Sequence, residues 1–215
     1  TGGTEKIARF AAEALGSRLG LTPEYISFTK PEEREQTRRF APDELVVMAS
    51  PVYAGRLPNK VMPEYKAKLF GDGTPVVPIC VFGNRSPDEG LRELVLLLED
   101  NGFRPVGAAA FAGRHAFSDK VGEGRPNQVD RTQMADFAAQ LADKLAGISL
   151  PPLAMDRSEI GPYYTPLKED GTPAKFLKAK PLTDWSKCSR CGACARACPM
   201  GSIDKTTMDA VGLCI

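Results

Sequence analysis

The sequence lacks a strong net charge and lacks any long hydrophobic run. Its 28 lysine and arginine residues nearly balance 27 aspartate and glutamate residues, so the formal net charge is +1. This balance, with no basic stripe and no acidic tail, argues against a nucleic-acid-binding protein. No apolar run approaches the ~18 residues that a membrane-spanning helix needs. We therefore expect a protein without a membrane span.

Cysteine is scarce outside one short stretch. The chain has six cysteines, and four of them lie between Cys188 and Cys198. A disulfide framework is disfavoured because this is a mid-sized chain in which no secretory signal peptide is visible. A nicotinamide-binding domain is also disfavoured, because no G-x-G-x-x-G unit follows a predicted strand. These absences favour a cytoplasmic protein with an ordinary hydrophobic core.

The cysteine-rich stretch has the spacing C-x2-C-x2-C-x3-C, followed by proline. Its cysteines are Cys188, Cys191, Cys194 and Cys198, and Pro199 comes next. In bacterial ferredoxins with this spacing, three thiolates hold one [4Fe–4S] cluster and the fourth ligates another. Zinc sites also use paired cysteines, but usually as two pairs separated by a long spacer. The pattern therefore predicts iron–sulfur chemistry and electron transfer.

Ahead of this stretch, strand-like and helix-like patterns alternate. We expect strands at residues 25–28, 44–49, 75–82 and 103–112, and helices that end near residues 20, 69, 101 and 147. Residues 31–39 are charged, and we expect a solvated helix or loop there. Such alternation is typical of an α/β fold with a parallel sheet and right-handed crossovers.

The composition divides the chain into three segments. Residues 1–149 form the predicted α/β domain, residues 150–180 a Pro/Gly-rich linker that packs on it, and residues 181–215 the cysteine-containing module. Both ends look cut. The chain has no initiator methionine and no strand before its opening glycines, and Cys214 resembles the start of a second cysteine run.

Three unusual segments are expected at one edge of the sheet. T-G-G-T at residues 1–4 leads directly into a helix, whose free N–H groups and dipole favour a phosphate. Residues 50–58 present Tyr53 after one strand, and G-N-R at residues 83–85 follows the next. Each alone has an ordinary explanation: a helix N-cap, a tyrosine that covers the sheet edge, or a βα turn. Together they favour a ligand site at the carboxyl ends of the strands.

The order T-G-G-T, S-P-V-Y-A-G-R-L-P and V-F-G-N-R resembles a flavodoxin-like domain. With the cysteine run behind it, the chain is similar to the flavodoxin–ferredoxin fusion proteins of anaerobic bacteria and archaea. The resemblance implies a doubly wound parallel α/β sheet of the flavodoxin-like class and a small C-terminal ferredoxin-like module. It also implies FMN and two [4Fe–4S] clusters as cofactors.

The resemblance also implies which residues hold these cofactors. Thr1, Gly2, Gly3 and Thr4 would bind the FMN phosphate; Pro51, Val52, Tyr53 and Gly55 would form one wall at the isoalloxazine ring, and Phe82, Gly83, Asn84 and Arg85 the other. Cys188, Cys191, Cys194, Cys198 and Cys214 would be cluster ligands. A further ligand would come from beyond residue 215, so the sequence as it stands completes neither cluster.

A few other residues invite a functional interpretation. Cys80 lies inside an apolar strand and is expected to be a buried hydrophobic residue. His115 is expected in a loop, either at the surface or within hydrogen-bonding reach of a flavin. Trp185 is expected in the core of the cysteine module, although it could also shield a cluster from water. Arg56 or Arg85 would tune the potential of an anionic reduced flavin.

Three functions remain open. The first is an electron carrier that passes electrons between [4Fe–4S] clusters and FMN, with no side chain acting as a catalytic acid or base. The second is an FMN-dependent reductase of a quinone, a flavin or dioxygen, fed by the clusters. The third is a regulatory module in which clusters or zinc are purely structural. For the first two, we expect a redox protein as partner, a ferredoxin or another oxidoreductase.

Overall fold

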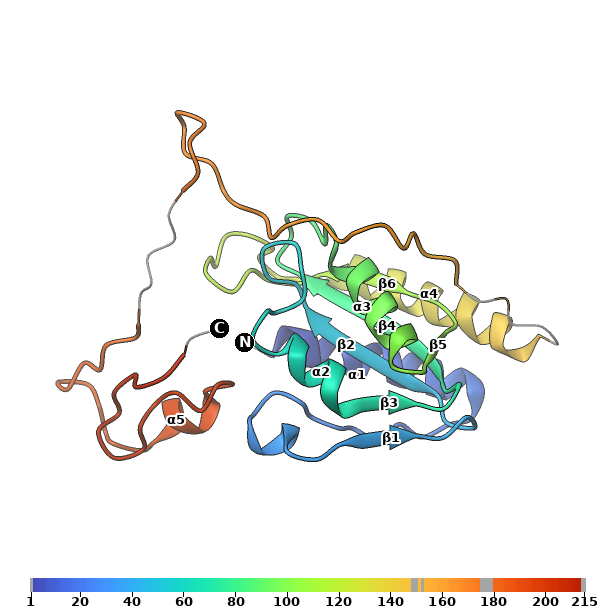
Figure 1. Cartoon of the computed structure of the whole chain (residues 1–215), viewed down its shortest axis with the longest axis horizontal. Helices are drawn as coiled ribbons and strands as arrows, with labels where there is room; N and C mark the ends of the chain where they lie inside the picture. The colour runs from blue at the N-terminus through green and yellow to red at the C-terminus, as the bar shows by residue number, and fades with distance from the viewer. Residues whose placement is uncertain (1, 148–150, 152, 175–179, 214–215) are drawn as a thin grey trace. The chain divides into compact units, whose positions relative to one another are not determined.

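The computed structural model describes residues 2–147, 151, 153–174 and 180–213 (Figure 1). Thr1 and Cys214, both predicted cofactor ligands, lie outside the described residues. The chain divides into two compact units, Thr1–Tyr25 with Arg38–Tyr164 and Ile26–Thr37 with Thr165–Ile215. We call them the α/β unit and the cysteine unit. Within the described residues, no helix has the length and apolar character needed to cross a membrane.

The main sheet of the α/β unit is entirely parallel and has β4 (Pro75–Phe82) at its centre. On one side β4 pairs with β2 (Val46–Pro51), in a register that sets Val46 opposite Val76. On the other side it pairs with β5 (Arg104–Pro105) and then β6 (Ala109–Ala112). A second parallel pair joins β1 (Arg38–Phe40) to β3 (Leu69–Gly71). The parallel α/β fold predicted from the alternation is confirmed.

Helices cover both faces of this sheet. Alternate side chains of β4, Val77, Ile79 and Val81, pack in one cluster with α1 (Gly3–Leu19) and α4 (Gln128–Ala146). The opposite face of β4 lies against α3 (Gly90–Asp100), which is nearer the viewer in Figure 1. α2 (Met62–Lys68) packs beside β3. Because β4 is buried on both faces, its sequence is nearly continuously apolar instead of alternating.

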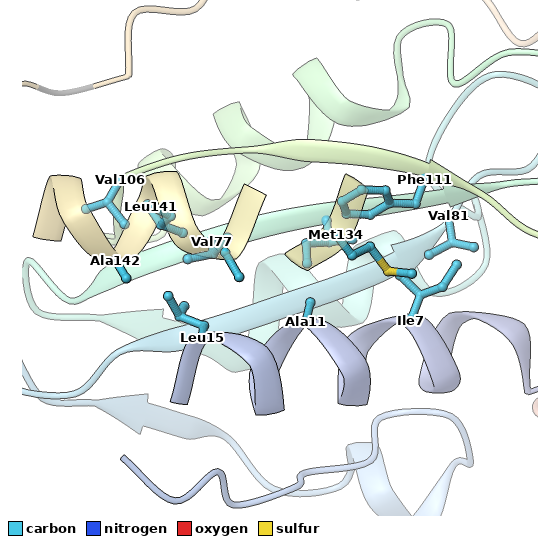
Figure 2. Packing of buried hydrophobic residues seen from close by; sticks show 12 residues of the cluster. Ile7, Ala11, Leu15, Val77, Val81, Val106, Phe111, Met134, Leu141 and Ala142 are labelled. Atoms are coloured by element: carbon cyan, nitrogen blue, oxygen red, sulfur yellow. The ribbon is translucent and has the colours of Figure 1, made fainter. Parts of the chain in front are cut away.

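The core also fixes the direction of α1. Figure 2 shows Ile7 beside Val81, and Leu15 beside Val77, so the helix runs antiparallel to β4. Ile7 is fully buried and Leu15 is nearly so. Burial of each such side chain stabilises the fold by about 1.5–3 kcal/mol. The N-terminus of α1 therefore lies at the edge where the parallel strands end.

The structure differs from the sequence-based expectations in several places. Residues 25–28 form no strand: Tyr25 instead donates a hydrogen bond to Glu13 on α1 at 2.9 Å. The predicted strand at 103–112 is divided, because the pairing with β4 shifts by one residue between β5 and β6. The charged segment at 31–39 is not simply solvated, since it contains a 3-10 turn (η1, Glu32–Arg34) whose Arg34 is only 6% exposed.

The cysteine unit has little regular structure. Within its described residues the one α-helix is α5 (Ala193–Ala197), and the buried hydrophobic residues are Ala195 and Met208. Short-range bonds to aspartates hold its turns, as where Asp204 accepts from the backbone N–H groups of Thr206 and Thr207. Trp185 is 51% exposed, so the prediction that it is a core residue is wrong.

Candidate cofactor sites

Loops from three neighbouring strands pack together at the carboxyl edge of the main sheet. After β2, the N–H of Val52 donates to the Val81 carbonyl at 2.8 Å. After β6, the N–H of Gly113 donates to the Phe82 carbonyl, also at 2.8 Å. Gly83 is so close to His115 that a Cβ at position 83 would lie 2.6 Å from the imidazole Cδ2. The structure thus brings two of the predicted segments together and adds the loop that contains His115.

The third predicted segment, at the start of α1, lies at the same edge because α1 is antiparallel to β4. Gly2 is the N-cap with φ of 70°, and no side chain caps the helix. A Cβ at Gly2 or Gly3 would meet no atom within 4 Å, so the first turn is open to a ligand. Uncapped N–H groups at a helix N-terminus are suited to phosphate oxygens.

Tyr53 lies at the entry to a tight turn. The N–H of Tyr53 donates to the Arg56 carbonyl at 2.8 Å, and the N–H of Arg56 donates back at 3.1 Å. The two residues between them, Ala54 and Gly55, have φ of 49° and 78°. The Tyr53 side chain is 40% exposed, its hydroxyl bonds to no other described residue, and burial raises its pKa. A partly exposed ring with an unused hydroxyl is suited to contact a planar ligand.

The loop after β4 presents Asn84 and Arg85 in different ways. Asn84 has φ of 66° and makes no side-chain hydrogen bond within the described residues. Arg85 instead forms an ion pair with Asp88, and its guanidinium lies 4.0 Å from the centre of the Tyr164 ring. Hydrogen bonds from Ser86 and Arg85 lower the pKa of Asp88. The charge of Arg85 is therefore already balanced by a neighbouring carboxylate.

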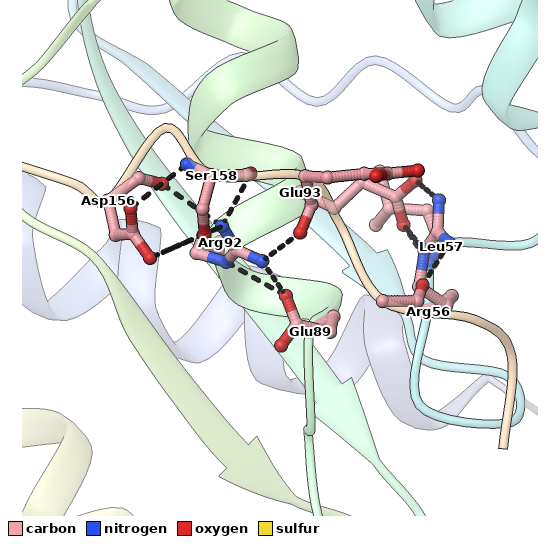
Figure 3. A network of polar contacts seen from close by, with 9 residues as sticks. Arg56, Leu57, Glu89, Arg92, Glu93, Asp156 and Ser158 are labelled. Atoms are coloured by element: carbon pink, nitrogen blue, oxygen red, sulfur yellow. Dashed lines mark hydrogen bonds and ion pairs between the residues drawn. The ribbon is translucent and has the colours of Figure 1, made fainter.

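A buried ion pair anchors the Tyr53 turn to α3 (Figure 3). The Arg56 guanidinium donates two bonds to Glu93, the one from Nε measuring 2.9 Å, and Glu93 also accepts from the Leu57 N–H at 2.9 Å. Hydrogen bonding to Glu93 raises the pKa of Arg56. Both side chains are at most 15% exposed. The pair could not be predicted from the sequence, because its members are 37 residues apart and no local pattern links them.

The segment Asp156 to Tyr164 crosses the same loops. Arg92 on α3 donates to the backbone carbonyls of Ser158 and Glu159, as part of the network in Figure 3. Further along, the Tyr163 hydroxyl donates to the Leu57 carbonyl at 2.8 Å, and the Tyr164 N–H donates to the Ala54 carbonyl at 2.7 Å. Tyr164 thus joins the Tyr53 turn through its backbone and Arg85 through its ring. Its aromatic character was the only sequence signal for this role.

Unfavourable backbone conformations concentrate around the candidate sites. Five non-glycine residues of the described chain have positive φ: Ala54, Asn84, Asp88, Arg190 and Met208. The first three lie in the two loops beside Tyr53 and Arg85, and the other two lie in the cysteine unit, where Arg190 is within the cysteine run. Such conformations cost about 1–3 kcal/mol each and cluster at functional sites.

The four described cysteines of the run are free thiols in a setting suited to thiolates. Backbone N–H groups point at two of the sulfurs, from Arg190 to Cys188 Sγ at 3.4 Å and from Ser202 to Cys198 Sγ at 3.3 Å. The pKa of Cys191 is lowered, chiefly by the Ala193 N–H. Cys194 and Cys198 both line an apolar cavity of about 220 Å³. Cys188 and Cys198 are partly buried, whereas Cys191 and Cys194 are exposed. Hydrogen bonds to sulfur and solvent exposure are among the factors that set cluster potentials.

A single metal ion and a cuboidal cluster require different arrangements of the cysteine sulfurs. Among the described residues, no three cysteine, histidine, aspartate or glutamate side chains gather closely enough to hold one metal ion. A tetrahedral zinc site requires its ligands to converge on one atom. In a cuboidal cluster each cysteine binds its own iron, so the sulfurs need no common point.

Comparison with protein families assigns this segment. Residues 181–204 match the family model described as a 4Fe-4S binding domain. This segment is therefore similar to 4Fe–4S binding domains. The match contains Cys188, Cys191, Cys194 and Cys198, and it confirms the iron–sulfur interpretation of the motif. No curated protein matches the chain.

Solved structures that resemble the chain include two flavodoxins. The flavodoxin of Megasphaera elsdenii is 18% identical with a TM-score of 0.42, and covers 65% of this chain and 93% of its own. The flavodoxin of Streptococcus pneumoniae TIGR4 is 21% identical with a TM-score of 0.43, and the match covers 67% of this chain and 92% of that flavodoxin. Rubredoxin oxygen:oxidoreductase from Desulfovibrio gigas is 20% identical with a TM-score of 0.42, and the match covers 67% of this chain and 33% of the oxidoreductase. A parallel α/β unit with a 4Fe–4S binding domain is consistent with the fusion that the sequence resembles.

Two further residues have the environments that the sequence suggested. Cys80 is fully buried in β4, and burial raises the pKa of its thiol to about 12. It is therefore an unreactive core residue. His115 lies in the loop after β6, where its Nδ1 accepts a hydrogen bond from the Phe117 N–H at 3.1 Å. Phe117 is 93% exposed.

Proposed function

We propose that the protein transfers electrons between FMN, bound at the carboxyl edge of the α/β unit, and [4Fe–4S] clusters in the cysteine unit. The observation that carries the proposal is that one chain contains two features. One is a segment that matches a 4Fe–4S binding domain, and the other is a sheet edge at which an uncapped helix and two strained loops lie. When bound, FMN exchanges one or two electrons, and a cluster exchanges one at a time.

On this proposal, the chain binds and orients its cofactors instead of supplying acids or bases. The N–H groups of Gly3 and Thr4, with the residue 1 threonine outside the described part, would hold the FMN phosphate. Pro51, Val52, Tyr53 and Gly55 would line one side of the isoalloxazine ring, and Phe82, Gly83, Asn84 and Arg85 the other. Tyr164, which contacts both loops, would exclude water at the rim of this site.

The cysteines would hold the clusters. Cys188, Cys191 and Cys194 would be ligands of one cluster, and Cys198 with Cys214 ligands of a second. The N–H bonds to Cys188 and Cys198 would stabilise negative charge on those sulfurs. We also propose the domain limits 1–149, 150–180 and 181–215 and a location in the cytoplasm, where thiols stay reduced.

The test is cofactor analysis of anaerobically purified full-length protein, with a site variant. We expect iron, acid-labile sulfide and FMN on the same chain, and weaker FMN binding in Tyr53→Ala, measured by quenching of flavin fluorescence. Tyr25→Ala is the matched control, because Tyr25 is 42% exposed, close to the 40% of Tyr53, and contacts α1 instead. Protein that binds no FMN, or zinc in place of iron, would overturn the proposal.

A further inference from the structure

Arg34 is a buried arginine that contacts the end of the cysteine run from far away in the sequence. It is 6% exposed and lies in the segment Ile26–Thr37, which clusters with the C-terminal residues in the cysteine unit. Its Nη2 donates to the carbonyl oxygen of Pro199 at 2.7 Å, and its Nη1 donates to the carbonyls of Phe28 and Thr29. Pro199 directly follows Cys198, so Arg34 holds the peptide next to a predicted cluster ligand.

A second contact brings the same segment against the turn after Cys198. The Gly201 N–H donates to the Cys198 carbonyl at 3.2 Å, and Gly201 has φ of 60°. A Cβ at position 201 would lie 3.2 Å from Cγ of Pro31. The turn that follows Cys198 is therefore closely packed against the segment that contains Arg34. The segment thus makes two independent contacts with the turn, a hydrogen bond at Pro199 and a steric contact at Gly201, the residues on either side of Met200.

The segment itself is ordered by one carboxylate. Glu33 accepts from the Ser27 hydroxyl and from the N–H groups of Thr29 and Lys30, both at 2.9 Å. Burial alone would raise the pKa of Glu33, but these bonds lower it below its usual value. The loop formed in this way also presents the Phe28 and Thr29 carbonyls to Arg34. Arg34 is thus fixed from its own side before it reaches Pro199.

We propose that Arg34 is a positioning residue for the cluster ligand Cys198 and raises the reduction potential of the cluster bound there. Reduction adds one negative charge to a cluster. Because the Arg34 guanidinium is itself nearly buried, water screens its charge little, and it would stabilise the reduced form of a cluster bound at Cys198. The fixed Pro199 carbonyl would also restrict the position of the Cys198 sulfur. This inference rests on the proposed binding of [4Fe–4S] clusters.

Arg196 supplies a matched comparison within the same unit. Its Nη1 donates to the Cys191 carbonyl at 2.8 Å, so it also binds a backbone carbonyl of the cysteine run. Unlike Arg34, Arg196 is exposed to solvent. Water screens the charge of an exposed arginine, so its removal is expected to change a cluster potential less.

The experiment is an anaerobic redox titration, monitored by EPR, of full-length protein and three variants. We expect Arg34→Gln, which keeps an N–H donor but loses the charge, to lower the potential. Arg34→Lys keeps the charge and is expected to stay close to the wild-type potential. Both Arg34 variants should release iron to a chelator several-fold faster than wild type. Neither glutamine nor lysine can replace the guanidinium that donates to three carbonyl oxygens at once. Arg196→Gln should change both quantities less than Arg34→Gln.

The outcomes separate this inference from the proposed function. Wild-type protein that binds no iron–sulfur cluster would remove the proposed function and the inference together. Wild-type protein that binds clusters, with Arg34→Gln equal to Arg196→Gln in potential and iron release, would overturn the inference alone. If Arg34→Gln retains too little cluster to titrate, Arg34→Lys decides: unchanged iron release in that variant contradicts a positioning role.

Discussion

In the α/β unit, aliphatic side chains from β4, α1, α3 and α4 fill the interior, whereas the cysteine unit buries only Ala195 and Met208 among its described hydrophobic residues. The first unit can be stabilised by packing alone. The second has a helix of five residues, aspartate-bonded turns and free thiols. Units this small usually depend on disulfides or metals. The difference indicates that the α/β unit is stabilised by its own core, whereas the cysteine unit would depend on its proposed clusters for its fold.

Iron removal is expected to have the largest effect on this comparison. Chelation of iron, or the double substitution Cys188→Ser and Cys191→Ser, should abolish protection from hydrogen exchange throughout residues 180–213, because cluster binding energy is also folding energy for this unit. The α/β unit should keep its protection, since its core contains no cluster ligand. Equal loss of protection in both units, or none in either, would contradict the contrast.

Breaking the buried ion pair should be the most costly single change within the α/β unit. Arg56→Met leaves the Glu93 carboxylate buried without its partner, which costs about 3–5 kcal/mol in the free energy of unfolding. Weaker FMN binding should accompany this loss, because Arg56 anchors the Tyr53 turn. Denaturant unfolding and flavin fluorescence measure the two effects.

The control for this change is the double variant Arg56→Met with Glu93→Leu. Replacement of a buried ion pair by apolar residues is often neutral or stabilising. We therefore expect the double variant to recover much of the stability of wild type. A double variant as unstable as Arg56→Met would show that the buried charge is not the cause.

A cavity in the core of the α/β unit tests whether the two units are stabilised independently. Leu94 on α3 is fully buried, and Leu94→Ala should lower the free energy of unfolding of the α/β unit by about 2–5 kcal/mol. The iron content and the reduction potential of the clusters should not change. Leu21 provides the control within the same unit, since Leu21→Ala removes the same atoms from a residue that is 54% exposed. A change in cluster potential in Leu94→Ala would contradict independent stabilisation of the two units.

The smallest expected effect concerns acid pH. The pKa of Asp88 is lowered in the folded state by its bonds to Ser86 and Arg85, so its contribution to stability is present above the pKa of an unfolded aspartate, about 3.9. The contribution is lost as the pH falls through the lower, folded pKa. NMR titration of the Asp88 carboxyl in flavin-free protein measures that pKa. Arg85→Gln should move it upward, and an unchanged value would show that the ion pair has no role.

Local sequence signals predicted much of the α/β fold. β4 was recognised from eight nearly continuous apolar residues, and the end of α1 from Gly20, whose φ is 70°. The predicted strand at 25–28 failed because a strand also needs a neighbour with which to pair, and composition does not supply one. The break between β5 and β6 depends on register with β4, which is equally invisible in a single strand.

The candidate sites also contain features that local sequence reveals and features that only the fold reveals. The cysteine spacing and the three loop motifs are contiguous in sequence, so residue type and order were enough to suggest a chemistry for each. The family match supports the iron–sulfur prediction, and FMN binding by the loops stays a prediction. The pairs Arg56–Glu93, Arg85–Tyr164 and Arg34–Pro199 join residues from distant segments. Charged residues such as Arg34 and Glu93 look solvated until the fold buries them. Sequence motifs therefore indicated which ligands to expect, and the structure added what positions them.

The most direct test of the central claim is transfer of an electron between flavin and cluster within one molecule. Anaerobic full-length protein would be reduced at its flavin by a light pulse in the presence of EDTA as the electron donor, and the visible bands of flavin and cluster would be followed together. The account predicts that flavin reoxidation and cluster reduction proceed with one first-order rate that is independent of protein concentration. A rate that rises with protein concentration, or a cluster that stays oxidised, would contradict it.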